Sequence, residues 1–140
     1  PNVIDHLESI QNSSILCPDT LHSMALTNYI NKSIGNNKLH DYIYININTY
    51  RNLSNTLLEC IDRYLGLECI IPYGGIYTCL NIKQDGIKFT ERCVKEEGVL
   101  VVPGWGFGNS MKNAVRLSYG PFVKCPEKID EGIKRMKNLL

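Results

Sequence analysis

The side chain of this sequence best suited to bind a ligand is Arg116, which stands in the middle of an apolar segment. Residue types alternate over 115–119, so the apolar ones are expected on one face of a strand and Arg116 and Ser118 on the other. If that face borders a cleft, a carboxylate held by two parallel N–H···O bonds is the natural ligand. The plainer interpretation is an arginine at the surface of an edge strand.

The segment before Arg116 favours the binding role. Gly98–Val102 is a short aliphatic run typical of a buried strand, and Pro103-Gly104 then forces a turn. The glycines that follow keep the backbone close, and Phe107 is the one side chain of this loop expected to plug a hole. This flanking pattern shifts the prediction from a surface arginine to a carboxylate-binding one.

Several short motifs, in order along the chain, resemble the C-terminal part of fold-type I pyridoxal-phosphate (PLP) aminotransferases of classes I and II. Around the arginine they are Glu97-Gly98-Val99, Val102-Pro103-Gly104-x-x-Phe107-Gly108 and Val115-Arg116-Leu117-Ser118. Upstream, residues 72–77 (Pro-Tyr-Gly-Gly-Ile-Tyr) are similar to the family's Pro-x-Gly-Gly followed by an aromatic strand. Residues 11–18 resemble the segment that follows the Schiff-base lysine region. Together the motifs cover nearly all 140 residues.

The resemblance implies a division of roles between two domains. In that family an N-terminal large domain holds PLP through a lysine, an aspartate and a phosphate-binding group, all of which would precede residue 1. Residues 1–140 would then form a single C-terminal small domain that closes over an amino-acid or 2-oxo-acid substrate, with Arg116 binding its α-carboxylate. The full-length protein is expected to be a homodimeric aminotransferase. This chain alone, without the Schiff-base lysine, is expected to be inactive and to bind no PLP.

The sequence leaves two alternatives open. A PLP lyase or synthase of the same fold, such as a cystathionine β-lyase-like or aminocyclopropane-carboxylate-synthase-like enzyme, would share the arginine and differ in large-domain residues. A non-catalytic amino-acid-sensing module is the other alternative, because helix-covered sheets also make ligand-binding and dimerisation domains.

Composition argues against several other classes of protein. A 140-residue chain with 44% hydrophobic residues suits a soluble globular domain with its own core, and a net charge of +1 without a basic stripe argues against a nucleic-acid partner. The sequence shows neither a signal peptide nor an apolar run that could cross a bilayer, so no membrane association and a cytoplasmic location are expected. The six cysteines include no C-x-x-C pair and are interpreted as small packing residues.

Other residue types that could do chemistry have plainer interpretations. The histidines show no spacing typical of a metal site or of a nucleophile–base pair; they are His6, His22 and His40. The lysines at positions 32, 38, 83, 88, 95, 112 and 124 lie in polar stretches, and none has the buried setting that a Schiff-base lysine requires. The glycine-rich turns do not open helices and are interpreted as plain turns. Tyr77 and Trp105 either line a cleft or belong to the core, and the sequence does not separate the two.

The remaining pattern predicts the elements that position Arg116. Helices are expected from Pro18 to Gly35, over 39–65 and 87–97, and from Pro126 to the end, with strands at 68–71, 76–82, 98–102 and 113–119. This order predicts an α+β fold in which a small, mostly antiparallel sheet is covered by helices, the long helix and the last helix on one face. Residues 42–47 also alternate like a strand, but the longer helical spacing predicts a helix there.

Overall fold

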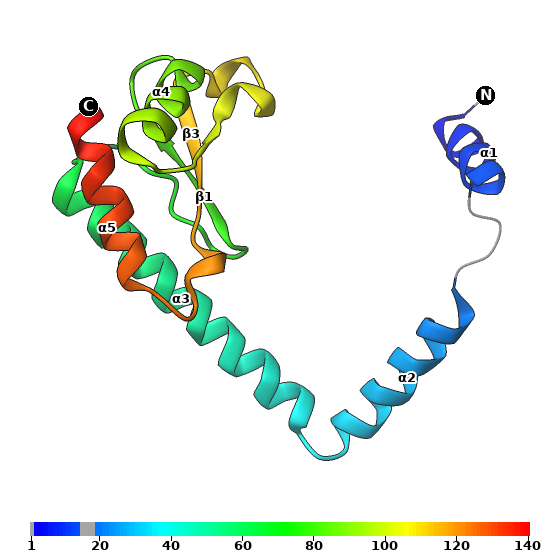
Figure 1. The fold of residues 1–140 in the computed structure, drawn as a ribbon. Coiled ribbons are helices and arrows are strands. Elements are labelled where there is room, and N and C mark those ends of the chain that lie inside the picture. Colours follow the sequence, from blue (N-terminus) through cyan, green and yellow to red (C-terminus); the bar gives the residue numbers. More distant parts are fainter. Residues whose placement is uncertain (1, 15–18) are drawn as a thin grey trace. The chain divides into compact units, whose positions relative to one another are not determined.

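The computed structural model describes residues 2–14 and 19–140, which divide into two compact units, Pro1–Tyr44 and Ile45–Leu140. The first unit holds α1 (Val3–Ser14), α2 (Thr20–Ile34) and the start of α3 (Lys38–Tyr64) (Figure 1). The second holds the rest of α3, then β1 (Tyr77–Asn81), α4 (Gly86–Arg92), β2 (Val102–Pro103), β3 (Ala114–Ser118) and α5 (Glu127–Met136).

The helices of the first unit bury very little. Neither α1 nor α2 has a buried apolar residue, and Ser33 is the one buried side chain on α2. The carboxylate of Asp19 caps α2 by accepting from the backbone N–H of His22 at 3.1 Å, and this bond is the main reason that the pKa of Asp19 lies below its usual range. The helix ends at Gly35 as expected, whereas the predicted start at Pro18 and the end of the 11–18 motif lie outside the described residues.

The long helix α3 confirms the helical prediction through 42–47. It ends where Gly66 takes a left-handed φ of +59° and donates its N–H to the carbonyl oxygen of Ile61 at 3.0 Å. Its apolar stripe is buried only in the C-terminal half, within the second unit. The buried residues of this half are Leu53, Ser54, Leu57, Cys60 and Ile61.

The second unit is built on a three-stranded antiparallel sheet in the order β1-β3-β2. In this register Arg116, on the central strand, pairs with Cys79 of β1 and with Val102 of β2. A small antiparallel sheet combined with helices confirms the predicted α+β fold.

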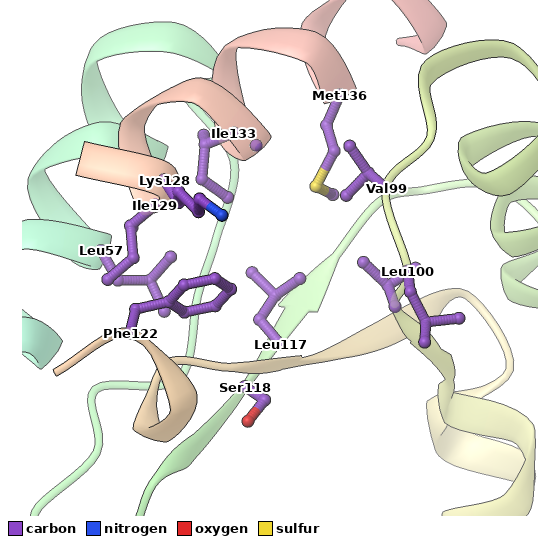
Figure 2. A pocket seen from close by; sticks show the side chains of 12 residues that line it. Leu57, Val99, Leu100, Leu117, Ser118, Phe122, Lys128, Ile129, Ile133 and Met136 are labelled. Carbon is purple, nitrogen blue, oxygen red and sulfur yellow. The ribbon is translucent and has the colours of Figure 1, made fainter. Parts of the chain in front are cut away.

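One face of this sheet packs against the hydrophobic core of the second unit. Leu80, Val115 and Leu117 join a buried cluster with residues of α3 and α5, which are Leu53, Leu57, Cys60, Ile61, Ile129, Ile133 and Met136. A hollow of about 70 Å³ remains between α5 and the sheet (Figure 2). In Figure 2, Leu117 points toward the hollow and Ser118 points away from it, so successive residues of β3 face opposite sides.

Two of the predicted strands are shorter than expected. Residues 68–71 make only one isolated bridge, between Cys69 and Leu80, because Pro72 follows with no N–H to extend the ladder. Of the predicted strand 98–102, only Val102 pairs with β3, and Leu100 is 83% exposed. The expected long edge strand is therefore reduced to the two residues of β2.

The segment expected as a helix over 87–97 changes its geometry part-way. It begins as α4, with the carboxylate of Asp85 accepting from the N–H groups of Ile87 and Lys88, and continues as a π-helical turn over Cys93–Glu97. Gly98 then ends it with a left-handed φ of +66°, as predicted for a glycine at this position.

Candidate carboxylate-binding site

Arg116 lies on the face of β3 opposite the core. Its strand neighbours Val115 and Leu117 are buried in the core, whereas Arg116 itself is half-buried on the other face. Cys79 stands directly across from it on β1, and Tyr77 lies two residues before Cys79 on the same face. The alternation predicted from the sequence is therefore confirmed, and the arginine sits at the centre of this face of the sheet.

Two aromatic rings lie next to the guanidinium of Arg116. The Cζ atom is 4.3 Å from the centroid of the Tyr77 ring and 5.3 Å from that of Phe107. Both distances are in the range of cation–π attraction. The Nε atom is buried and has no hydrogen-bond partner among the described residues. The guanidinium is thus held by rings, which use none of its five N–H donors.

The other four arginines of the chain all have an oxygen partner. Arg63 lies 3.9 Å from Asp130, Arg92 donates to Glu96 at 3.1 Å, Arg51 donates to Asn48 at 3.4 Å, and Arg135 pairs with Glu131. Among the arginines of the described chain, Arg116 alone has neither an ion pair nor a hydrogen bond from its side chain. It is the one arginine of which no guanidinium donor is bonded to another group of the described chain.

Phe107 reaches the arginine because the loop after β2 folds tightly back on β3. Gly104 begins this loop, and a Cβ atom there would lie 2.2 Å from the carbonyl oxygen of Met111 and 2.7 Å from that of Ala114. Only glycine allows so close an approach of two backbone segments. The turn predicted at Pro103-Gly104 is therefore what carries the ring of Phe107 to the arginine.

Tyr77 is positioned by the turn that precedes β1. The buried hydroxyl of Tyr119 donates to the carbonyl oxygen of Gly75 at 2.9 Å, and the N–H of Tyr119 donates to Ile76 at 3.1 Å. Gly75 takes a left-handed φ of +78°. Because these bonds tie the 72–77 motif to the residue after β3, the aromatic side chain of Tyr77 is held beside Arg116.

The aromatic residues of the site differ from the sequence expectation. Phe107 is 51% exposed and so does not plug a hole, because its ring lies beside Arg116 on the face of the sheet opposite the core. Tyr77 and Trp105 are 45% and 62% exposed, so neither belongs to the core. That Tyr77 and Phe107 meet at Arg116 depends on strand register and loop fold, for which the sequence carries no local signal.

The histidines and cysteines interpreted as structural are not gathered into a metal-type cluster in the described part of the chain. No group of three or more His, Cys, Asp or Glu residues that could hold a metal occurs in 2–14 and 19–140. Burial raises the pKa of the Cys93 thiol to about 11 and also raises that of Cys79, against the opposing charge of Arg116. High thiol pKa values disfavour the nucleophilic thiolate. None of the described helices combines the length and apolar content that a bilayer-spanning segment needs.

The lysines of this chain do not fit a PLP site. Every lysine is exposed. A lysine that links covalently to PLP has to be held in a pocket with a lowered pKa. None of the lysines therefore lies in such a pocket, and Arg116 remains the candidate group for an anionic ligand.

Comparison with known proteins supports the family resemblance. No protein-family model matches the chain. It is 40% identical over 75 residues to (5-formylfuran-3-yl)methyl phosphate transaminase of Methanocaldococcus jannaschii, covering 54% of this chain and 20% of that protein. It is 35% identical over 95 residues to putative aminotransferase YugH of Bacillus subtilis, covering 66% of this chain and 24% of that protein. Further matches are named aspartate, aromatic-amino-acid and LL-diaminopimelate aminotransferases.

The solved structures agree with the sequence matches. A mutant aspartate aminotransferase of Thermus thermophilus superimposes with a TM-score of 0.78 at 28% identity, covering 99% of this chain and 36% of that chain. The chain resembles the C-terminal part of fold-type I PLP-dependent aminotransferases. Its α+β second unit matches the small domain of these aminotransferases. The chain spans about a fifth to a quarter of the length of the curated aminotransferases it matches.

Proposed function

We propose that this chain is the C-terminal small domain of a PLP-dependent aminotransferase, which transfers an amino group between an amino acid and a 2-oxo acid. Its contribution is Arg116, which binds the α-carboxylate of the substrate. PLP, held by a large domain outside these residues, supplies the chemistry that activates the Cα–H bond. The complete enzyme is a homodimer, as is usual for this family, and acts in the cytoplasm.

The observation that carries the proposal is the unpaired guanidinium of Arg116. A partly buried cation without a counter-ion is unfavourable unless an anion binds to it. Two parallel bonds from a guanidinium match the planar geometry of a carboxylate. Several of the curated relatives support this choice of ligand, because their names include aspartate, aromatic amino acids and diaminopimelate. What these substrates share is the amino acid's α-carboxylate and not one side chain.

The residues around Arg116 have a second role in this proposal. When the domain closes over a substrate, Tyr77 and Phe107 cover the guanidinium and keep water from it. With less water present, the charge-assisted bonds to the carboxylate are stronger. Fixing the carboxylate also orients the Cα–H bond of the substrate relative to the cofactor.

The proposal is tested by Arg116→Lys in the complete enzyme. Lysine keeps the charge but cannot form the planar fork, and a charge-assisted hydrogen bond is worth roughly 1.5–3 kcal/mol. We expect kcat/KM for an amino acid to fall by about 10- to 100-fold, at about 1.4 kcal/mol per factor of ten. Both kcat and KM should change, since the same bonds bind and orient the substrate. PLP binding should hardly change.

The control is the decarboxylated analogue of the same amino acid. This amine has no carboxylate for Arg116 to bind, so its kcat/KM should be nearly the same in both proteins. An equal loss for the amino acid and the amine would show that Arg116 is structural and would refute the proposed role.

A further inference from the structure

The Nε atom of Arg116 is closed to ligands, although the residue as a whole is half-buried. Nε is buried without a hydrogen-bond partner, whereas neither Nη atom is both buried and unpartnered in the described structure. A guanidinium can offer a planar carboxylate either its Nε–Nη edge or its Nη1–Nη2 edge. With Nε buried, only the Nη1–Nη2 edge is open.

The rings that lie beside the guanidinium come from both sides of β3. Tyr77 belongs to β1, and Phe107 belongs to the loop after β2, while Arg116 is on the strand between them. Their centroids are 4.3 and 5.3 Å from Cζ. The faces of aromatic rings attract a cation without accepting a full hydrogen bond from it. The rings thus offset part of the desolvation of Nε while they leave the Nη donors free.

The contact of the two rings with the guanidinium matters because the side chain of arginine is long and flexible. A free arginine loses rotamer freedom when it clamps a ligand, and this loss weakens binding. A side chain already held in the binding geometry loses less. The two rings come from elements fixed by other contacts, namely the Gly104 turn and the bond from Tyr119 to Gly75.

We infer that Tyr77 and Phe107 are positioning residues, which hold the guanidinium of Arg116 so that a substrate carboxylate binds end-on across its Nη1 and Nη2 atoms. This role rests on the proposed carboxylate binding by Arg116. In this role the two rings contribute to the affinity and orientation of the substrate. The carboxylate then has a single binding geometry.

The first test is kinetic and uses the complete enzyme. Tyr77→Leu and Phe107→Leu should each lower kcat/KM for an amino acid by roughly three- to tenfold, the strength expected of one cation–π contact. The decarboxylated amine should show no such loss. Tyr77→Phe and Phe107→Tyr keep a ring and should restore most of the lost activity. Trp105→Leu is the matched control, since Trp105 is an exposed ring of the same loop with no contact to Arg116 among the described ones.

The second test asks whether the rings act through the arginine. In an Arg116→Ala background, Tyr77→Leu should change kcat/KM for the amino acid little, because no guanidinium remains to be positioned. A loss of the same size in both backgrounds would mean that the ring acts elsewhere. That result would overturn the positioning role.

The binding geometry is tested by a crystal structure of the complete enzyme with a bound carboxylate analogue of the substrate. We expect carboxylate oxygens on Nη1 and Nη2, with Nε still buried and without a partner. An oxygen bonded to Nε would overturn the end-on geometry. If Arg116→Lys itself affects amino acid and amine equally, the proposed function fails. If that variant is selective but the leucine variants are not, only the positioning role fails.

Discussion

At the scale of single residues, the arginines of this chain differ in whether neighbouring groups occupy their N–H donors. Asp130 accepts from the hydroxyl of Tyr64 at 2.9 Å and lies 3.9 Å from Arg63, so these groups satisfy one another and link α3 to α5. Rings at Arg116 do the opposite, because they hold the cation without occupying its donors. What singles out Arg116 as the candidate for ligand binding is therefore its neighbours and not its exposure, since Arg116 is less exposed than Arg63.

A variant of Tyr119 tests how much its hydrogen bond to Gly75 stabilises the turn that precedes β1. Tyr119→Phe removes the hydroxyl that donates to Gly75, and we expect the free energy of unfolding to fall by about 0.5–1.5 kcal/mol. Urea unfolding measures this change. Tyr73→Phe is the matched control, because the side chain of Tyr73 is fully exposed and should contribute almost nothing. Equal effects of the two variants would contradict a stabilising role for the Tyr119 bond.

Part of the site could be predicted from the sequence, for a physical reason. The alternation around Arg116 is a property of neighbouring residues, so the face on which it lies follows from local pattern. The rings at Arg116 come from positions 77 and 107, and bringing them together requires the strand register and the folded loop. Such non-local contacts leave no spacing signal in the sequence.

At the scale of elements, the helices followed from sequence better than the short strands did. A helix such as α3 makes its hydrogen bonds within itself, so its periodicity is sufficient evidence. A strand exists only where a partner pairs with it, and residues 99–101 lack that pairing despite their apolar character. The helix α1 was not predicted, although Val3, Leu7 and Ile10 show the spacing of a helix.

Gly132 tests how much helix propensity contributes to the stability of α5. It is inside the helix, a Cβ atom added to it would meet no other atom within 4 Å, and its side of α5 borders the hollow of Figure 2. We expect Gly132→Ala to stabilise the protein by about 0.5–1 kcal/mol, from helix propensity alone. Thermal and urea unfolding measure this gain.

The comparison variant for Gly132 is Gly98→Ala. Gly98 has a left-handed φ of +66°, where an L side chain is strained by roughly 1–2 kcal/mol. This substitution should therefore destabilise the protein. If both alanines shifted stability in the same direction, backbone conformation would not be what distinguishes the two glycines.

At the scale of the whole chain, the two units differ in how far their apolar side chains are buried. The second unit buries a continuous cluster, whereas Leu7 on α1 and Met24 on α2 are 61% and 66% exposed. Exposed apolar side chains at helical spacing are typical of surfaces that are covered in a larger protein. This supports the proposal that a large domain accompanies these residues in the complete enzyme.

The division of roles predicts how the isolated chain responds to PLP. All of its lysines are exposed, so none lies in the pocket that a cofactor-linking lysine needs. We expect the visible spectrum of the purified chain mixed with PLP to match that of PLP with Nα-acetyl-lysine at the same amine concentration. Borohydride reduction followed by peptide mass spectrometry should find only scattered, substoichiometric labelling. Stoichiometric labelling of one lysine would mean that the cofactor binds here, and the assignment of these residues to a small domain would then be wrong.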